Sequence, residues 1–247
     1  MLRQYLGLIP RTLWKLFFAL NFVTGLVLLY PFFALLLSGK RYQLAFQLMR
    51  FWAHWVLHVP GIFLKVKYEI PPDSLPEPCV YVANHSSYLD IVASYVVIPK
   101  LFVYLGKSEI EKAPLVRIFF REMNIYVDRK SRSGSYAAIQ QASEKLRGGE
   151  SVFIYPEGTI EPWGRLKLFK NGAFRLAIEN QVPVVPITFR NNWKLLQNGG
   201  FFKAHGRPGI ARVTVHRPIL TAGKTEEDLV NLRHQARETI AQELQKP

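Results

Sequence analysis

The first sixty residues carry the longest apolar stretch of the chain. Residues 16–37 read LFFALNFVTGLVLLYPFFALLL, a run of 22 residues without charge that is long enough to cross a bilayer. Basic residues flank both ends, so the positive-inside rule is satisfied only if both ends face the cytosol. Asn21, Thr24, Gly25 and Pro31 are possible break points of a helix. The pattern favours two short helices that dip into one leaflet over a single span.

Residues 42–58 predict a further helix, because apolar and aromatic side chains recur at helical spacing. These side chains are Phe46, Met49, Trp52, Trp55 and Val56. The tryptophans suit a helix at a membrane surface, but a helix packed on a protein core has the same pattern, so both interpretations stay open. A cleavable signal peptide is disfavoured, because the apolar run is too long and no small-residue cleavage site follows it. We therefore expect membrane-anchoring helices over residues 1–60 and a separate domain over residues 61–247.

After residue 60 the pattern changes to short apolar runs rich in Val, Ile, Phe and Tyr, which predict strands. The expected strands are residues 63–68, 79–83, 101–105, 124–127, 151–155, 184–189 and 211–216. Helices are predicted at residues 133–147 and 225–244, the second of which opens with the capping box Thr225-x-x-Asp228. This alternation predicts an α/β domain with a mixed, largely parallel sheet flanked by helices.

A basic excess limits the partners of the chain. Its 247 residues carry a formal net charge of +14, which nucleic acid, anionic lipid or a phosphorylated small molecule would balance. Nucleic acid is disfavoured, because most basic residues are scattered and no zinc-finger, homeodomain or RRM signature occurs. The single cysteine, Cys79, excludes an intrachain disulfide and a cysteine metal cluster.

A histidine and a carboxylate lie close together in the loop after the expected strand 79–83. Functional groups in open α/β sheets lie beyond the carboxyl ends of strands, where His85 and Asp90 fall. If a helix starts near Ser87, Asp90 points back at His85 and would fix the imidazole tautomer for proton abstraction from an alcohol. Ser87-x-x-Asp90 also fits a helix capping box, so the spacing alone leaves both interpretations open.

Three further loops carry noteworthy residues. Residues 155–159 read YPEGT directly after a strand, where Pro fixes the turn and Gly allows close approach of the backbone to a ligand. Basic residues follow, and Gly172 then opens a helix whose N-terminus suits a phosphate. Residues 127–129 (VDR) offer an arginine for paired hydrogen bonds to phosphate, and residues 182–187 (VPVVPI) indicate an edge strand or a strand with an unusual path. The basic residues after the first loop are Arg165, Lys167 and Lys170.

Together these loops resemble four motifs of the glycerolipid acyltransferases of the 1-acyl-sn-glycerol-3-phosphate acyltransferase (lysophosphatidate acyltransferase) family. The motifs occur in order over residues 80–190, and four in sequence are a specific signal. Met123 and Ile160 depart from the family, which often has glycine and arginine there. The matching residues are Asn84-His85-x-x-x-x-Asp90, then Lys107-x-Glu109 through Pro114 to Val127-Asp128-Arg129, then Tyr155-Pro156-Glu157-Gly158-Thr159 with Phe169-Lys170-x-Gly172, and Val182-Pro183-Val184-Val185-Pro186-Ile187.

The resemblance implies a glycerol-3-phosphate acyltransferase-like fold, with residues 61–247 as the catalytic domain. His85, oriented by Asp90, would deprotonate the sn-2 hydroxyl of lysophosphatidic acid. That oxygen would attack a thioester of acyl carrier protein or coenzyme A, which gives phosphatidic acid for phospholipid biosynthesis without an acyl-enzyme, metal or cofactor. The enzyme would contact membrane lipids on the cytoplasmic side of the cell (inner) membrane. The implied substrate-binding residues are Lys107, Arg129, Glu157, Gly158 and Thr159, with Arg165 or Lys167 as further cations for the phosphate.

Three alternatives remain open at this point. The acceptor could be another lyso-lipid, such as lyso-ornithine lipid or a lysophospholipid with a larger head group. The chain could be a non-catalytic lipid-binding module, although His85, Asp90 and Glu157 argue against it. Water could also replace the acceptor, which would make the protein a hydrolase, but the sequence lacks the Gly-x-Ser-x-Gly elbow of a serine hydrolase.

His54 and His58 have a spacing that could bind a metal, but their place on an interfacial helix explains them better.

Overall fold

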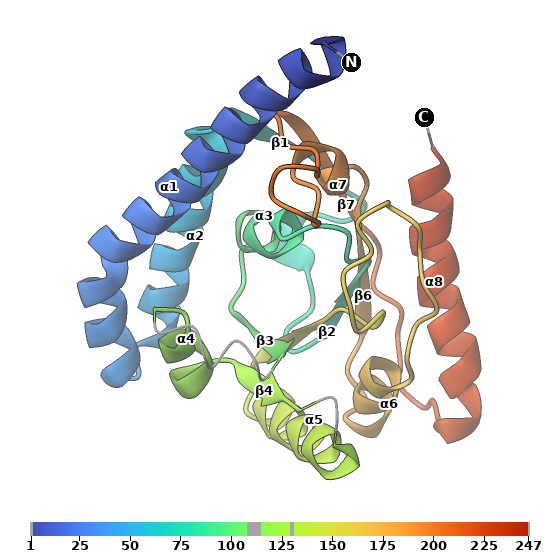
Figure 1. Ribbon diagram of the computed structural model, residues 1–247. Coiled ribbons are helices and arrows are strands. Elements are labelled where there is room, and N and C mark those ends of the chain that lie inside the picture. The colour runs from blue at the N-terminus through green and yellow to red at the C-terminus, as the bar shows by residue number, and fades with distance from the viewer. Residues whose placement is uncertain (1, 108–114, 129–130, 247) are drawn as a thin grey trace.

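The structure is a computed structural model that describes residues 2–107, 115–128 and 131–246. Its centre is a seven-stranded sheet in the order β1-β7-β6-β2-β5-β3-β4 (Figure 1). Neighbouring strands are parallel except β6 and β7, which are antiparallel, so the expected mixed, largely parallel sheet is confirmed. The strands, which match those expected with small shifts at their ends, are β1 (Ile62–Tyr68), β2 (Val80–Ala83), β3 (Phe102–Lys107), β4 (Ile125–Val127), β5 (Ser151–Ile154), β6 (Val184–Phe189) and β7 (Gly209–Val215).

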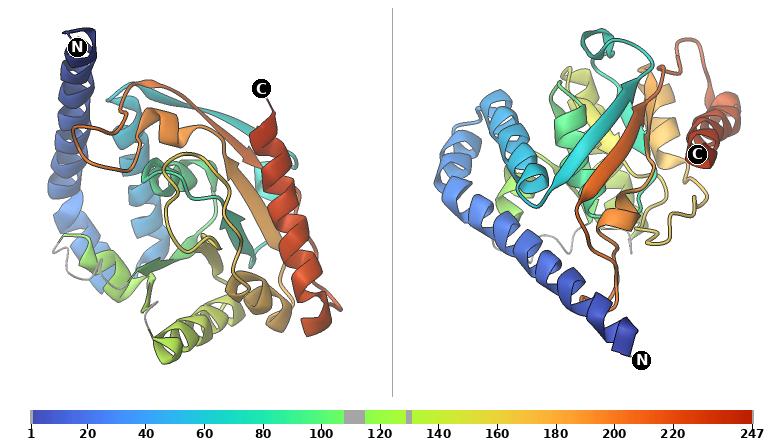
Figure 2. Two further views of the ribbon diagram at one scale, coloured as in Figure 1. Left: turned by 45° about the vertical axis from the view of Figure 1, so that its right-hand side comes forward. Right: turned by 90° about the horizontal axis from the view of Figure 1, so that it is seen from above.

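Helices cover both faces of the sheet. Figure 2 shows α6 and α8 on one face and α2 and α3 on the other, with α1 packed outside α2. The expected capping box is present, since the Thr225 and Asp228 side chains each accept from the other's backbone N–H at the entry to α8. The helices are α1 (Leu2–Ser38), α2 (Tyr42–His58), α3 (Leu89–Val97), α4 (Arg117–Glu122), α5 (Arg132–Arg147), α6 (Gly172–Glu179), α7 (Asn192–Leu195) and α8 (Leu229–Gln245).

The N-terminal apolar run forms one continuous helix, so the expected break into two short helices is wrong. Two of the residues taken as break points are instead packing contacts with α2. Asn21 Oδ1 accepts a hydrogen bond from Trp55 Nε1 at 2.7 Å. A Cβ atom on Gly25 would lie 2.7 Å from Trp52 Nε1, so this glycine lets the two helices approach closely. The helix α1 runs through Pro10 and Pro31 without a break and packs against α2.

The two sides of α1 differ in character. Its inner side joins the hydrophobic core through Leu26, Phe33 and Leu37, together with most of the buried side chains of α2. Its outer side exposes apolar residues along most of the helix. Residues 9–38 are long and apolar enough to cross a membrane by length and composition. Whether the helix dips into one leaflet or spans the bilayer stays a prediction. The exposed apolar residues of α1 are Ile9, Leu13, Leu16, Phe17, Leu20, Val23, Val27, Leu28, Phe32 and Leu35.

Two adjacent phenylalanines test how far α1 contributes to the folded core. Phe33 is fully buried and makes an edge-to-face contact with Phe119 at 4.8 Å between ring centroids, whereas Phe32 is 58% exposed. We expect Phe33→Ala to lower the free energy of unfolding by about 3–5 kcal/mol, because it leaves a cavity in the core. Phe32→Ala is the matched control and should have little effect. Denaturant unfolding in detergent micelles measures both, and equal effects would contradict the packing of α1.

Candidate active site

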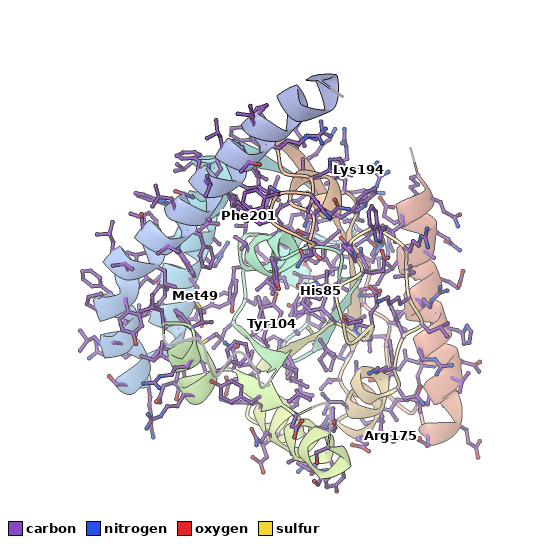
Figure 3. All side chains as sticks on the ribbon, viewed as in Figure 1. Met49, His85, Tyr104, Arg175, Lys194 and Phe201 are labelled. Carbon is purple, nitrogen blue, oxygen red and sulfur yellow. The ribbon has the colours of Figure 1, made fainter. Side chains whose placement is uncertain are left out.

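Two neighbouring central strands bring the first and third sequence motifs together. β2 pairs with β5, and the loops that follow these strands carry His85 and Glu157 respectively. The imidazole of His85 stacks on the ring of Tyr155, with 3.8 Å between centroids and 15° between planes. The Asn84 side chain donates from Nδ2 to the carbonyl of Phe189 and accepts at Oδ1 from its N–H, which ties the end of β2 to the end of β6. Figure 3 shows His85 at the centre of the molecule.

Asp90 lies in the first turn of α3 and holds the loop that carries the histidine. Its Oδ2 atom accepts hydrogen bonds from the backbone N–H groups of Ser86 at 2.6 Å and Ser87 at 2.9 Å. The same oxygen lies 3.1 Å from Nδ1 of His85. Asp90 therefore fits both interpretations of the sequence. It holds the start of α3 by accepting from backbone N–H groups, and it also faces the imidazole of His85.

The hydrogen bond to Asp90 decides which imidazole nitrogen is free. An ionised carboxylate only accepts, so Nδ1 of His85 carries the proton and Nε2 keeps its lone pair. The Asp90 side chain has no solvent exposure, and His85 is 9% exposed. This arrangement suits a base that takes a proton at Nε2 and forms an imidazolium stabilised by the carboxylate.

Asn192, which sequence reasoning missed, completes the surroundings of the carboxylate. It opens α7 and donates from Nδ2 to Oδ1 of Asp90 at 2.8 Å. It lies 102 residues from Asp90 along the chain, so no local spacing links the two. The one available signal is its position just beyond the carboxyl end of β6, where this sheet collects its functional residues.

Glu157 is buried and binds backbone donors from two loops. Its Oε1 atom accepts from the N–H of His85 at 2.8 Å, and its Oε2 atom accepts from the N–H of Lys167 at 3.1 Å. Burial raises the pKa of this carboxyl to about 7, against the lowering effect of the two hydrogen bonds. In this structure Glu157 therefore holds the histidine loop to the segment after β5.

Glu161 supports the same region and was also missed from the sequence. Its backbone N–H donates to the carbonyl of His85 at 2.8 Å. Its buried side chain accepts at Oε2 from the N–H groups of Trp163 and Arg165, at 3.0 and 2.7 Å. The loop after β5 therefore binds both the N–H and the carbonyl of His85, through Glu157 and Glu161 respectively.

The structure describes some of the residues expected to bind phosphate and not others. Gly158 adopts a φ of +74°, and a Cβ atom there would lie 3.0 Å from Nζ of Lys170, so this lysine reaches the turn. Thr159 is exposed beside it. The Lys107 side chain and Arg129 lie outside the described residues. Within the described part of the chain, no group of three His, Cys, Asp or Glu side chains could hold a metal ion.

The raised pKa of Glu157 gives a pH-dependent stability. Between pH 4.5 and about 7 the folded chain holds a proton that the unfolded chain has released, so the contribution of Glu157 to stability is complete below pH 4.5 and falls across this range. This contribution, about 3 kcal/mol, disappears as the pH rises through 7. Denaturant unfolding of wild type and Glu157→Gln across this pH range isolates the contribution of Glu157. All other groups titrate in both proteins, so the difference between the two free energies of unfolding reports Glu157 alone. Parallel stability curves would contradict the assignment.

Comparisons with known proteins agree with this geometry. The family model described as Acyltransferase matches residues 65–190. The chain is 32% identical over 193 residues to 1-acyl-sn-glycerol-3-phosphate acyltransferase beta of Homo sapiens, covering 75% of this chain and 68% of the relative. It is 32% identical over 216 residues to the chloroplastic 1-acyl-sn-glycerol-3-phosphate acyltransferase LPAT1 of Arabidopsis thaliana, covering 86% and 57%.

A third curated relative and a solved structure extend the comparison. The chloroplastic 1-acyl-sn-glycerol-3-phosphate acyltransferase BAT2 of Brassica napus is 34% identical over 143 residues, covering 58% of this chain and 41% of the relative. The chain thus spans less than two thirds of the length of the two plant relatives. The crystal structure of the 1-acyl-sn-glycerophosphate (LPA) acyltransferase PlsC from Thermotoga maritima shares the fold, with a TM-score of 0.78, 22% identity, and coverage of 96% of this chain and 95% of that one. From the matched family model and the human relative, the chain belongs to the acyltransferase family, which includes the 1-acyl-sn-glycerol-3-phosphate acyltransferases.

Proposed function

We propose that the chain transfers an acyl group from a thioester of acyl carrier protein or coenzyme A to the sn-2 hydroxyl of 1-acyl-sn-glycerol-3-phosphate. The product is phosphatidic acid. The observation that carries the proposal is the buried His85–Asp90 pair, which leaves Nε2 of the histidine free to act as a base. The names of the curated relatives supply the acceptor.

The reaction proceeds in one transfer without an acyl-enzyme. Nε2 of His85 takes the proton of the acceptor hydroxyl, and that oxygen attacks the thioester carbonyl. The carbon–sulfur bond then breaks, and the leaving thiolate takes the proton back from the imidazolium. Asp90 stabilises the imidazolium between these steps. Backbone N–H groups near the third or fourth motif stabilise the oxyanion.

Ser86, Ser87 and Cys79 are hydrogen-bonded or buried, which supports direct transfer without an acyl-enzyme on any of them. Ser87 Oγ donates to the carbonyl of Leu196 at 2.5 Å. Burial raises the pKa of the Cys79 thiol to about 12, so its thiolate is scarce at neutral pH. Ser86 is buried beside the histidine, and its backbone N–H is held by Asp90.

The acceptor phosphate binds at the turn formed by Gly158 and Thr159. Lys170 lies against Gly158 and supplies the cation nearest to this turn among the described residues. Lys107 and Arg129 join it, as the family resemblance implies. Glu157 supports this site by fixing the His85 loop next to it.

The outer side of α1 attaches the enzyme to one leaflet of the cell membrane, with the catalytic domain on the cytoplasmic side. Apolar residues cover this side, and the chain has no Asp or Glu before Glu69. The inner side carries polar groups bonded to the protein, such as Trp14 Nε1, which donates to the carbonyl of Pro60 at 2.9 Å. A helix bound to its own domain along one side lies more readily at the surface of a leaflet than across a bilayer.

The base is tested by replacing His85. We expect His85→Ala to lower acceptor-dependent thiol release by ~10²- to 10⁴-fold, because general-base catalysis is lost. His54→Ala, an exposed histidine on α2, is the matched control and should keep wild-type turnover. Thiol release from an acyl thioester, with and without 1-acyl-glycerol-3-phosphate, measures the effect. Wild-type turnover of His85→Ala with an intact fold would sink the mechanism.

The acceptor is tested on the same assay. Release that occurs without any acceptor would identify a thioesterase instead. Release with another lyso-lipid, but none with lysophosphatidate, would keep the His85 chemistry and replace the acceptor. Absence of turnover with a panel of lyso-lipids would favour a lipid-binding protein.

The phosphate site is tested by removing one cation. We expect Lys170→Met to raise KM for lysophosphatidate by about tenfold or more, because a charge-assisted hydrogen bond to phosphate is lost. The turnover number should fall less, since His85 and Asp90 are untouched. Lys65→Met, an exposed lysine on β1, is the control. Steady-state kinetics with varied acceptor give both constants, and an unchanged KM would place the phosphate elsewhere.

A further inference from the structure

A loop between α7 and β7 presents two phenylalanines to solvent. The pairing of Leu196 with Gly206 closes the loop at its base. At the tip of the loop, the backbone N–H groups of Lys203 and Ala204 both donate to the carbonyl of Gly200 and form a tight turn. Phe201 and Phe202, here called the aromatic tip, are 41% and 68% exposed, and their rings contact each other at 5.5 Å between centroids. Two large apolar side chains at the end of one loop need a partner surface.

The aromatic tip is fixed to α1. Lys15 of α1 is buried and donates from Nζ to the carbonyl of Phe201 and, at 2.6 Å, to the carbonyl of Ala204. The same ammonium lies 5.2 Å from the centroid of the Phe201 ring. A Cβ atom on Gly206 would lie only 2.4 Å from Cγ of Lys15, so this glycine admits the lysine stem. Phe201 therefore lies beside the N-terminal half of α1 (Figure 3).

The charged residues of the two segments that carry this region are all basic. No Asp or Glu occurs in residues 1–68 or in residues 180–225, and the acidic residues all fall in the rest of the chain. Exposed Lys194, Lys203 and Arg207 flank the aromatic tip. A surface that combines exposed aromatic side chains with only positive charge is complementary to an anionic bilayer.

We propose that the aromatic tip is a second lipid-binding element, which inserts into the same leaflet as the outer side of α1. Lys194, Lys203 and Arg207 then lie among the anionic headgroups. The proposal rests on the membrane attachment of α1 proposed above, but not on the identity of the acyl acceptor.

The same loop connects the bilayer to the active site. At its root, Asn192 donates to Asp90, and Ser87 Oγ donates to the carbonyl of Leu196. The N–H of Tyr88 donates to Oδ1 of Asn198 at 3.1 Å. Insertion of the aromatic tip therefore fixes the distance between the His85 loop and the membrane surface. A lipid acceptor enters the active site from that surface, and the product returns to it.

The native cysteine is buried, so the proposal can be tested directly by labelling cysteines introduced at exposed positions. Cys79 is buried with a raised pKa, so a cysteine at an exposed position takes a maleimide fluorophore alone. The positions are Phe202→Cys in the aromatic tip, Leu20→Cys on the outer side of α1, and Leu220→Cys as a control. Leu220 matches Phe202 at 68% exposure but lies on the loop between β7 and α8.

Each labelled full-length protein is transferred from detergent into vesicles of phosphatidylcholine and phosphatidylglycerol, with and without doxyl-labelled lipid. We expect an environment-sensitive label at position 202 to brighten and to be quenched by the doxyl group, as at position 20, while the label at position 220 stays in water. Quenching at position 20 alone would overturn the proposal and keep the membrane role of α1. Quenching at neither position would overturn both.

Two variants test the contributions separately. Phe201→Ser with Phe202→Ser should weaken flotation with these vesicles by about tenfold or more, because apolar area is lost from the bilayer, while Leu220→Ser should not. Lys15→Met should abolish quenching at position 202 and preserve it at position 20, since only the attachment of the tip is lost. Circular dichroism checks the fold of each variant. Unchanged flotation of the double variant, or unchanged quenching in Lys15→Met, would contradict the corresponding step.

Discussion

The buried carboxylate of Asp90, in the first turn of α3, receives donors from two parts of the chain: the loop after β2 and the start of α7. A charge without solvent contact is costly unless hydrogen bonds replace its hydration. The N–H groups of Ser86 and Ser87, Nδ1 of His85 and Nδ2 of Asn192 provide that replacement. The same bonds fix the imidazole, so the group that needs stabilising also positions the base. Loss of any donor would therefore disturb stability and orientation together.

Glu157 repeats this principle on the adjacent strand. Its two oxygens bind backbone N–H groups from loops that are far apart in sequence, and its charge is opposed by burial. Because β2 and β5 run parallel and side by side, their carboxyl ends deliver both carboxylates to one edge of the sheet. Both acidic groups thus hold the surrounding loops in place through hydrogen bonds, and Nε2 of His85 is the atom that we propose takes the substrate proton.

The sequence predicts well the features that depend on short segments. Seven strands follow from runs of β-branched and aromatic residues, and His85 and Asp90 are five residues apart in one loop. Prediction failed where distant residues decide. Nothing near Asn192 signals Asp90, and the antiparallel direction of β7 has no local signature. Asn21 and Gly25 resemble helix breakers until α2 is present as their packing partner. Lys107 and Arg129 rest on family resemblance alone.

Phe33 and Leu37 of α1 are buried in the same hydrophobic core as the sheet, which affects what proteolysis of α1 would do to the protein. Many membrane proteins release a working soluble fragment when a protease cuts their anchor. Here α1, the proposed membrane anchor, supplies core side chains, so such a cut would expose apolar surface and remove part of the packing that supports the sheet. Activity away from the membrane would then be lost through unfolding. Proteolysis of α1 would act as a route to degradation, and not as a switch between bound and soluble forms.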